Sequence, residues 1–197
     1  RGMSASRSIR RPLAESLERL PDLERVMSVN YFGPARLIRA VLPAMRAQRS
    51  GFVVNVLSAG ANIPSPWFGA YTASKAALGQ LGNTLAAEHA HEGIHVANVF
   101  LPWVRTPMMD ATGAYEETDA MTPDAACDWI LEGIVDKKRL VFDAEIQRRF
   151  VLGVVAPAFM VRITNVLSRI YADDPSQHPE LDFDRAVLKK FVKGRIL

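Results

Sequence analysis

The strongest constraint on the fold is a pair of apolar segments on either side of one long helical stretch. Residues 51–58 are apolar apart from Asn55 and end in a small polar residue, and residues 94–101 form a second largely apolar run. Between them, helical periodicity extends over residues 70–92, and Gly93 ends it. A strand, a helix and a strand with short connections form a βαβ unit. We therefore expect an α/β protein with a parallel sheet, in which the strand at residues 51–58 is buried on both faces.

Side chains that could act on a substrate lie at the carboxyl end of this unit. Tyr71 and Lys75 are four residues apart, so both project from one face of a helix. We expect the ammonium group to lower the pKa of the phenol by about three units, which would make Tyr71 a proton donor and acceptor near neutral pH. Ser58 ends the first strand and would hold the substrate oxygen. Taken alone, the Tyr-x-x-x-Lys spacing also fits an exposed helical pair.

Four linked motifs resemble the short-chain dehydrogenase/reductase family. Ser58, Tyr71 and Lys75 match the order and spacing of that family's Ser, Tyr and Lys. The segment at residues 26–33 is similar to the helix that carries its catalytic Asn, here Asn30. Residues 102–108 are similar to its Pro-Gly-x-x-x-Thr segment over the nicotinamide. The resemblance extends from about Leu23 to Met108.

The resemblance implies a Rossmann-like doubly wound parallel sheet and NAD(P)(H)-dependent hydride transfer to or from a carbonyl or an alcohol. A reductive reaction favours NADP(H) over NAD(H). Asn30 would hold a water molecule in the proton path to Lys75. The implied catalytic residues are Asn30, Ser58, Tyr71 and Lys75, and the implied cofactor-binding residues are Tyr71, Lys75, Pro102, Val104 and Thr106.

One residue departs from the family's pattern. Trp103 follows Pro102, where the family usually has Gly. A side chain of this size would narrow the nicotinamide pocket or reshape the loop.

A second, weaker sequence resemblance bears on the substrate. The segments at residues 30–33, 36–38, 104–108 and 181–197 resemble the reductase domain of bacterial fatty acyl-CoA reductases, which implies a fatty acyl-CoA or fatty aldehyde substrate. Two alternatives remain open. One is a dehydrogenase or reductase of another lipophilic substrate such as a steroid. The other is a noncatalytic interaction domain that retains the fold. The intact Ser58, Tyr71 and Lys75 argue against this alternative, and the missing cofactor-binding half argues for it.

The family's phosphate-binding half has no counterpart in the sequence. No Gly-rich turn follows a strand, so the chain corresponds to the second, catalytic half of such a domain. We expect one partial domain over residues 1–197 that supplies the last three strands of a seven-stranded sheet. The strand at residues 51–57 would then expose an apolar edge. Residues from about 150 to 197 would form a substrate-side extension.

The carboxyl-terminal part is unusually apolar. Residues 150–161 are uncharged, but this segment is too short to span a bilayer. Beyond Pro157, apolar residues at helical spacing predict a helix that covers the core; they are Phe159, Ile163, Val166, Leu167 and Ile170. The same pattern suits a long acyl chain or peripheral contact with a membrane.

The cysteine and histidine content bears on the cellular compartment and on whether a metal site is expected. The single cysteine, Cys127, excludes an internal disulfide and suits a reducing, cytoplasmic compartment. It follows a helix start at Thr122-Pro123, and we expect it to pack in the interior. The histidines at 89, 91 and 95 do not share one helix face, so no metal site is expected.

The net charge of +3 is unevenly distributed. Basic residues gather at both ends of the chain, where they fit a solvated face or anionic groups such as the phosphates of coenzyme A, a cofactor or an acidic membrane. They lack interleaved aromatic residues, so nucleic acid is not an expected partner. These basic residues are Arg1, Arg7, Arg10, Arg11, Lys189, Lys190, Lys193 and Arg195. The family resemblance further implies a homo-oligomer that pairs through helices at about residues 21–48 and 71–92.

Overall fold

The structure is a computed structural model that describes residues 13–66, 68–107 and 120–172. The two terminal clusters of basic residues lie outside the described residues. The segment at residues 181–197, which carries part of the resemblance to fatty acyl-CoA reductases, also lies outside them.

Three parallel strands form the centre of the described chain. β1 (Gly51–Ser58), β2 (Ile94–Leu101) and β3 (Leu140–Val141) lie in the order β1-β2-β3, and both neighbouring pairs are parallel. Between β1 and β2 runs the long helix α5 (Gly69–His89), followed by the short 3₁₀ turn η3 (Ala90–Glu92). The predicted α/β fold with its βαβ unit is therefore confirmed.

The predicted helix break at Gly93 has a clear backbone cause. Gly93 has a φ of 77°, in the left-handed region, and a Cβ atom there would overlap the carbonyl oxygen of Arg49. The close approach lets the amide of Gly51 donate a hydrogen bond to the Gly93 carbonyl at 3.3 Å. β1 and β2 therefore begin side by side and run in register to Ser58 and Leu101.

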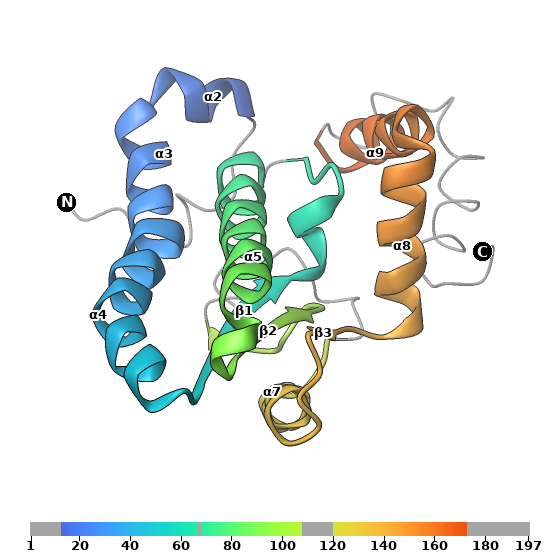
Figure 1. Cartoon of the computed structure of the whole chain (residues 1–197). Helices are drawn as coiled ribbons and strands as arrows, with labels where there is room; N and C mark the ends of the chain where they lie inside the picture. The colour runs from blue at the N-terminus through green and yellow to red at the C-terminus, as the bar shows by residue number, and fades with distance from the viewer. Residues whose placement is uncertain (1–12, 67, 108–119, 173–197) are drawn as a thin grey trace.

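Helices cover both faces of the sheet (Figure 1). One face is covered by α5 and by a nearly continuous helical run, and the opposite face by α7 (Pro123–Val135). The helical run consists of α2 (Leu13–Glu18), α3 (Leu20–Met27), the π-helical turn η1 (Ser28–Phe32) and α4 (Gly33–Gln48). Between α4, α5 and the strands lies a buried apolar cluster of Ile38, Val53, Leu85, Ala86 and Val96.

β1 is less buried than its sequence predicts. Val53, Asn55 and Leu57 are buried on one face, but Val56 on the other face is 38% exposed. The difference arises because β1 is the edge strand of the described sheet, whereas β2 lies between two strands and is buried along most of its length. The apolar run therefore predicted the strand correctly but was wrong about burial on both faces.

A buried amide network joins the strands to α5. Asn55 donates through Nδ2 to Oδ1 of Asn98 at 3.0 Å. Asn98 in turn donates to the Gly79 carbonyl at 3.1 Å and to Oδ1 of Asn83 at 3.0 Å. Because each amide finds partners, both strands tolerate a polar residue in the core.

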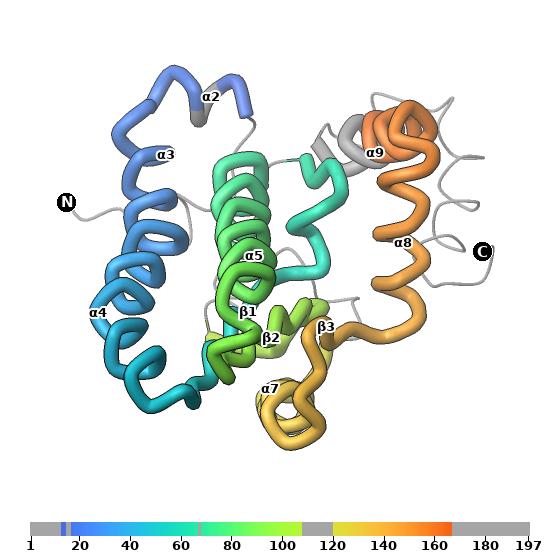
Figure 2. Tube along the Cα trace, viewed as in Figure 1, coloured from blue at the N-terminus to red at the C-terminus, as the bar shows by residue number. Residues whose placement is uncertain are grey.

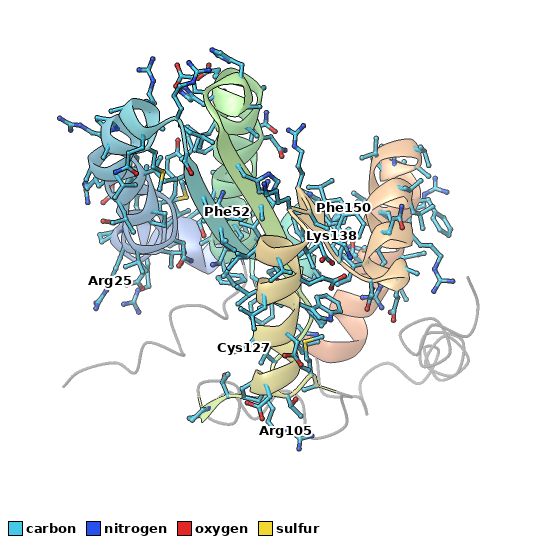
Figure 3. All side chains as sticks on the ribbon, turned by 60° about the horizontal axis from the view of Figure 1, so that its bottom comes forward. Arg25, Phe52, Arg105, Cys127, Lys138 and Phe150 are labelled. Atoms are coloured by element: carbon cyan, nitrogen blue, oxygen red, sulfur yellow. The ribbon has the colours of Figure 1, made fainter. Side chains whose placement is uncertain are left out.

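α7 begins as the sequence predicts but places its cysteine differently. Thr122 caps the helix by accepting a hydrogen bond from the Ala125 amide at 3.2 Å, with Pro123 in the first turn. Ala126 and Gly133 form its buried side. Cys127 is exposed, so the prediction of a packing role for it was wrong (Figure 3). The physical reason is the rotation of the helix, which turns the neighbouring Ala126 toward the sheet instead.

The described chain ends in two helices that meet at a sharp corner, α8 (Ala144–Val155) and α9 (Pro157–Ala172) (Figure 2). In the described residues no single helix is long and apolar enough to cross a membrane. Taken together, α8 and the first part of α9 pass that test of length and composition, but they are bent by 114°. Pro157 stands at the bend, where it opens the second helix.

The predicted helix after Pro157 is present, but its buried side differs from the prediction. Met160 and Thr164 are buried, whereas Phe159 is exposed. Thr164 can be buried because its hydroxyl donates to the Met160 carbonyl at 2.8 Å, which satisfies the polar group within the helix. The side chains of Leu167 and Ile170 lie outside the described residues.

Candidate active site

Ser58 is placed at the carboxyl end of β1 by the strand itself. Its Oγ accepts a hydrogen bond from the Gly60 amide at 3.2 Å and so caps the 3₁₀ turn η2 (Ala59–Asn62). α8 packs against this end of the sheet. Its residue Ile146 lies in one buried cluster with Leu57, Ala61 and Phe100. The Phe150 ring on α8 meets that of Phe100 edge-on at 4.7 Å between centroids.

Tyr71 lies in the first turn of α5, next to Ser58. Burial raises the pKa of the Tyr71 phenol above its usual value of 10.0, and a hydrogen bond with Ser58 partly offsets that rise in pKa. The phenol is therefore protonated at neutral pH and linked to the serine hydroxyl. The sequence-based expectation of a lowered pKa was wrong for this structure.

Lys75 explains why the expected pKa shift is missing. Its Nζ lies 5.9 Å from the centroid of the Tyr71 ring, so the two side chains share a helix face as predicted. The ammonium group, however, donates to the Val56 carbonyl of β1 at 2.9 Å instead of binding the phenol. Burial also lowers the pKa of Lys75, since it disfavours the charged form.

Asn30 lies on the π-helical turn η1 and is tied to the turn of α5 that carries Tyr71. Its Nδ2 donates to the Oγ of Ser74 at 3.1 Å, and this hydroxyl donates to the Tyr71 carbonyl at 2.6 Å. Ser74 is fully buried and was missed in the sequence, although a serine on the buried side of an Ala-rich helix is itself a signal. Irregular π turns often occur at functional sites, which fits the position of Asn30. A water molecule between Asn30 and Lys75 remains a prediction.

The segment after β2 is held in place by a residue far along the chain. Val104 and Met121 form an isolated parallel bridge. The Met121 amide donates to the Trp103 carbonyl at 2.8 Å, and the Arg105 amide donates to the Met121 carbonyl at 2.9 Å. In a parallel bridge of this kind, the amide and carbonyl of the central residue, Val104, point to the opposite side. Sequence reasoning did not single out Met121, because no local pattern indicates its partner.

This backbone geometry bears on whether a nicotinamide cofactor fits. A carboxamide carries one acceptor and two donors, and the outward amide and carbonyl of Val104 offer the complementary pair. Pro102, Val104 and Thr106 follow β2, and Ser58 ends β1, at the same carboxyl edge of the parallel sheet. The residues of this half are therefore compatible with the nicotinamide end of such a cofactor.

The histidines take part in no metal cluster within the residues that the structure describes. There, no group of three or more His, Cys, Asp or Glu side chains could hold a metal ion. His89 instead contacts Glu92 through Nδ1 at 3.1 Å, and Arg46 donates to the same carboxylate through Nε at 2.6 Å. These contacts hold the pKa of Glu92 at about 2 and tie the end of α4 to the turn before β2.

The fold and the site together define a Rossmann-like oxidoreductase arrangement, with a serine and a tyrosine at the carboxyl edge of a parallel sheet. The family described as short chain dehydrogenase matches residues 4–117, which is more than half of the chain. The chain belongs to this family, as its motifs predicted.

Curated relatives cover most of the chain but extend well beyond it. An uncharacterized oxidoreductase of Mycobacterium tuberculosis is 39% identical over 170 residues, which are 86% of this chain and 50% of the relative. A fatty acyl-CoA reductase of the same species is 43% identical over 129 residues, which are 65% of this chain and 44% of the relative. The chain thus spans about half the length of the curated relatives it matches.

Solved structures show the same fold. A short-chain dehydrogenase from Burkholderia cenocepacia in complex with NADP matches with a TM-score of 0.60 and 27% identity, over 69% of this chain and 56% of that one. A 4-hydroxyisoleucine dehydrogenase complexed with NADH matches with a TM-score of 0.52 and 25% identity, over 60% of this chain and 54% of that one. Members of this fold thus bind either nicotinamide cofactor.

Proposed function

We propose that the protein containing this chain is an NAD(P)(H)-dependent oxidoreductase that transfers hydride to or from a lipophilic carbonyl or alcohol. The substrate is a fatty aldehyde or fatty acyl-CoA, and NADP(H) is the preferred cofactor. The observation that carries the proposal is the pairing of the Tyr71 phenol with the Ser58 hydroxyl at the carboxyl edge of the sheet. The fatty substrate is supported by the name of the relative that is 43% identical to this chain.

The bound nicotinamide would supply hydride to the carbonyl carbon. The Ser58 hydroxyl donates a hydrogen bond to the substrate oxygen and stabilises the negative charge that develops there. Tyr71 donates its proton to that oxygen, and its raised pKa keeps the proton on the phenol until charge builds up. The reverse reaction requires the phenolate, so oxidation of an alcohol would become faster as the pH rises.

Four further residues have proposed roles around these two. Asn30 and Ser74 hold the turn of α5 that carries Tyr71. Lys75 binds the nicotinamide ribose, and the outward backbone groups of Val104 pair with the carboxamide.

The test is NADPH oxidation by the full-length protein with a long-chain aldehyde, and with the corresponding acyl-CoA. Tyr71→Phe should lower kcat at least about a thousandfold, because it removes the proton donor. Tyr31→Phe is the matched control, since it removes the same hydroxyl from a half-buried tyrosine that has no proposed role in the reaction, and it should retain activity.

The pH dependence gives a second readout. The reduction rate should stay level through neutral pH and fall only in the alkaline range, because the pKa of Tyr71 is raised. Equal rates for wild type and Tyr71→Phe would refute the assigned role. A folded wild type that turns over neither fatty substrates nor a steroid ketone would favour the noncatalytic reading.

We further propose that the protein is a cytoplasmic homo-oligomer. The single cysteine suits a reducing compartment. Three exposed apolar side chains on η1 and α4, those of Val29, Phe32 and Leu37, support pairing through this helical run. Light scattering on the full-length protein should show a smaller species for Leu37→Glu than for wild type.

Peripheral contact with a membrane is proposed at the corner of α8 and α9. Val154 and Val155 there are 76% and 70% exposed, and Phe159 and Val161 are exposed beside them. The exposed Arg162 lies nearby on α9, which suits an anionic surface. Co-sedimentation with anionic vesicles should be lost in Val154→Asp and unchanged in Val135→Asp, where the valine lies on α7.

A further inference from the structure

Two aromatic side chains meet beside the catalytic turn. The rings of Phe68 and Trp103 lie 5.7 Å apart between centroids and are tilted by 60°. Phe68 immediately precedes α5, and Trp103 lies two residues beyond the end of β2. Their contact therefore bridges the two segments that also carry Tyr71 and Val104.

Backbone hydrogen bonds fix both partners of this pair. The Phe68 carbonyl accepts from the Thr72 amide at 2.8 Å and from the Thr72 hydroxyl at 3.0 Å. Trp103 is held through its carbonyl by the Met121 amide. A rigid aromatic surface loses little conformational entropy when a ligand covers it, so it suits a recognition role.

The pair also lies close to Tyr71 and is partly open to solvent. Phe68 and Tyr71 are three residues apart at the start of α5, a spacing that brings side chains to the same side of a helix. Trp103 is 41% exposed, which is a large open apolar surface for an indole ring. An alkyl group attached to a carbonyl near Tyr71 and Ser58 would find this surface next to it.

We propose that Trp103 and Phe68 form a specificity-determining wall that contacts the alkyl chain next to the substrate carbonyl. This proposal rests on the proposed function and names the structural feature that selects a lipophilic substrate. It also gives a role to the residue at which the chain departs from its family's pattern. Each methylene group that leaves water for the wall should raise kcat/KM by up to roughly fourfold.

The experiment measures kcat/KM of the full-length protein for straight-chain aldehydes from butanal to dodecanal with NADPH. In wild type, log(kcat/KM) should rise with chain length over the first several carbons. Trp103→Ala should flatten this slope, so that the preference for dodecanal over butanal falls at least about tenfold. Phe68→Leu should reduce the slope less, and Trp103→Phe should restore much of it.

The control is Leu131→Ala, which truncates an exposed apolar side chain on α7, on the far face of the sheet, and should keep the wild-type slope. An unchanged slope in Trp103→Ala would overturn the proposal. So would an equal rise in KM for NADPH at every chain length, because that would assign the indole to the nicotinamide instead.

A binding measurement separates this proposal from the proposed function. Dodecanol should quench tryptophan fluorescence of the wild type, and the quenching should be reduced in Trp103→Phe. Quenching that depends on Trp103 without turnover of any aldehyde would refute the proposed function and retain the wall. If aldehydes are turned over, but neither the quenching nor the chain-length slope depends on Trp103, the proposed function stands and the wall is refuted. If there is neither turnover nor quenching that depends on Trp103, the proposed function and the wall are both refuted.

Discussion

Gly82→Ala is the substitution whose effect follows most directly from the structure. Gly82 faces the buried amide network, and a Cβ atom there would overlap Nδ2 of Asn55 and lie 2.5 Å from Oδ1 of Asn98. Both atoms belong to the hydrogen bond that joins β1 to β2 in the core, so neither can move without breaking it.

The cost has three parts. Overpacking a core by one methyl group costs about 1–3 kcal/mol. Loss of the hydrogen bond between the buried Asn55 and Asn98 side chains costs about 1–3 kcal/mol. Alanine favours the helix over glycine by about 1 kcal/mol, which offsets part of the loss. We expect a net decrease of about 3 kcal/mol in the free energy of unfolding.

The assay is equilibrium unfolding of the full-length protein in urea. Gly33→Ala in α4 is the matched control, since its nearest neighbour would be the Ser28 carbonyl oxygen at an ordinary 3.5 Å, and it should not destabilise. In an Asn55→Ala background, Gly82→Ala should cost less, because one of the two overlapping groups is gone. A neutral Gly82→Ala, or costs that add in the double variant, would refute the reasoning.

Two further predictions concern contacts that fix the ends of helices. Glu92→Gln should lower the Tm at neutral pH, because the contacts with Arg46 and His89 hold the pKa of Glu92 at about 2, below its ordinary value of 4.5. A carboxyl group whose pKa is lowered by folding stabilises the fold at pH values above its pKa in the unfolded chain, and this stabilisation is lost as the pH falls toward 2. The Tm values of wild type and Glu92→Gln should therefore converge in acid, and a difference in Tm that stays constant with pH would contradict this. Asp143→Ala should weaken α8 by about 1 kcal/mol in hydrogen exchange, because Asp143 caps the helix at the Ile146 amide, and Asp143→Asn should retain most of the protection. Equal exchange in all three proteins would contradict the capping role.

The framework of the site could be predicted because its signals are local. Apolar runs interrupted by a helical period identified β1, α5 and β2, and the Thr122-Pro123 signature identified the start of α7. Each of these patterns depends on residues that are neighbours in sequence, as does the placement of Tyr71 and Lys75 on one helix face.

What could not be predicted depends on residues that are distant in sequence. The Asn30–Ser74 hydrogen bond joins residues 44 positions apart, and the partner of Val104 is Met121. The rotation that exposes Cys127 likewise follows from how α7 packs on the sheet. No local periodicity encodes such contacts, since they form only when separate elements pack together.

The sequence by itself determined the family and the parallel βαβ core, and it predicted the residues that would carry the chemistry, because all of these follow from residue type and short-range spacing. Only the tertiary structure decided the protonation of those residues. Packing buries the Tyr71 phenol beside Ser58 and turns Lys75 toward the Val56 carbonyl. The pKa of the phenol therefore rises where the i, i+4 spacing alone predicts a fall, because desolvation depends on what surrounds a side chain in space.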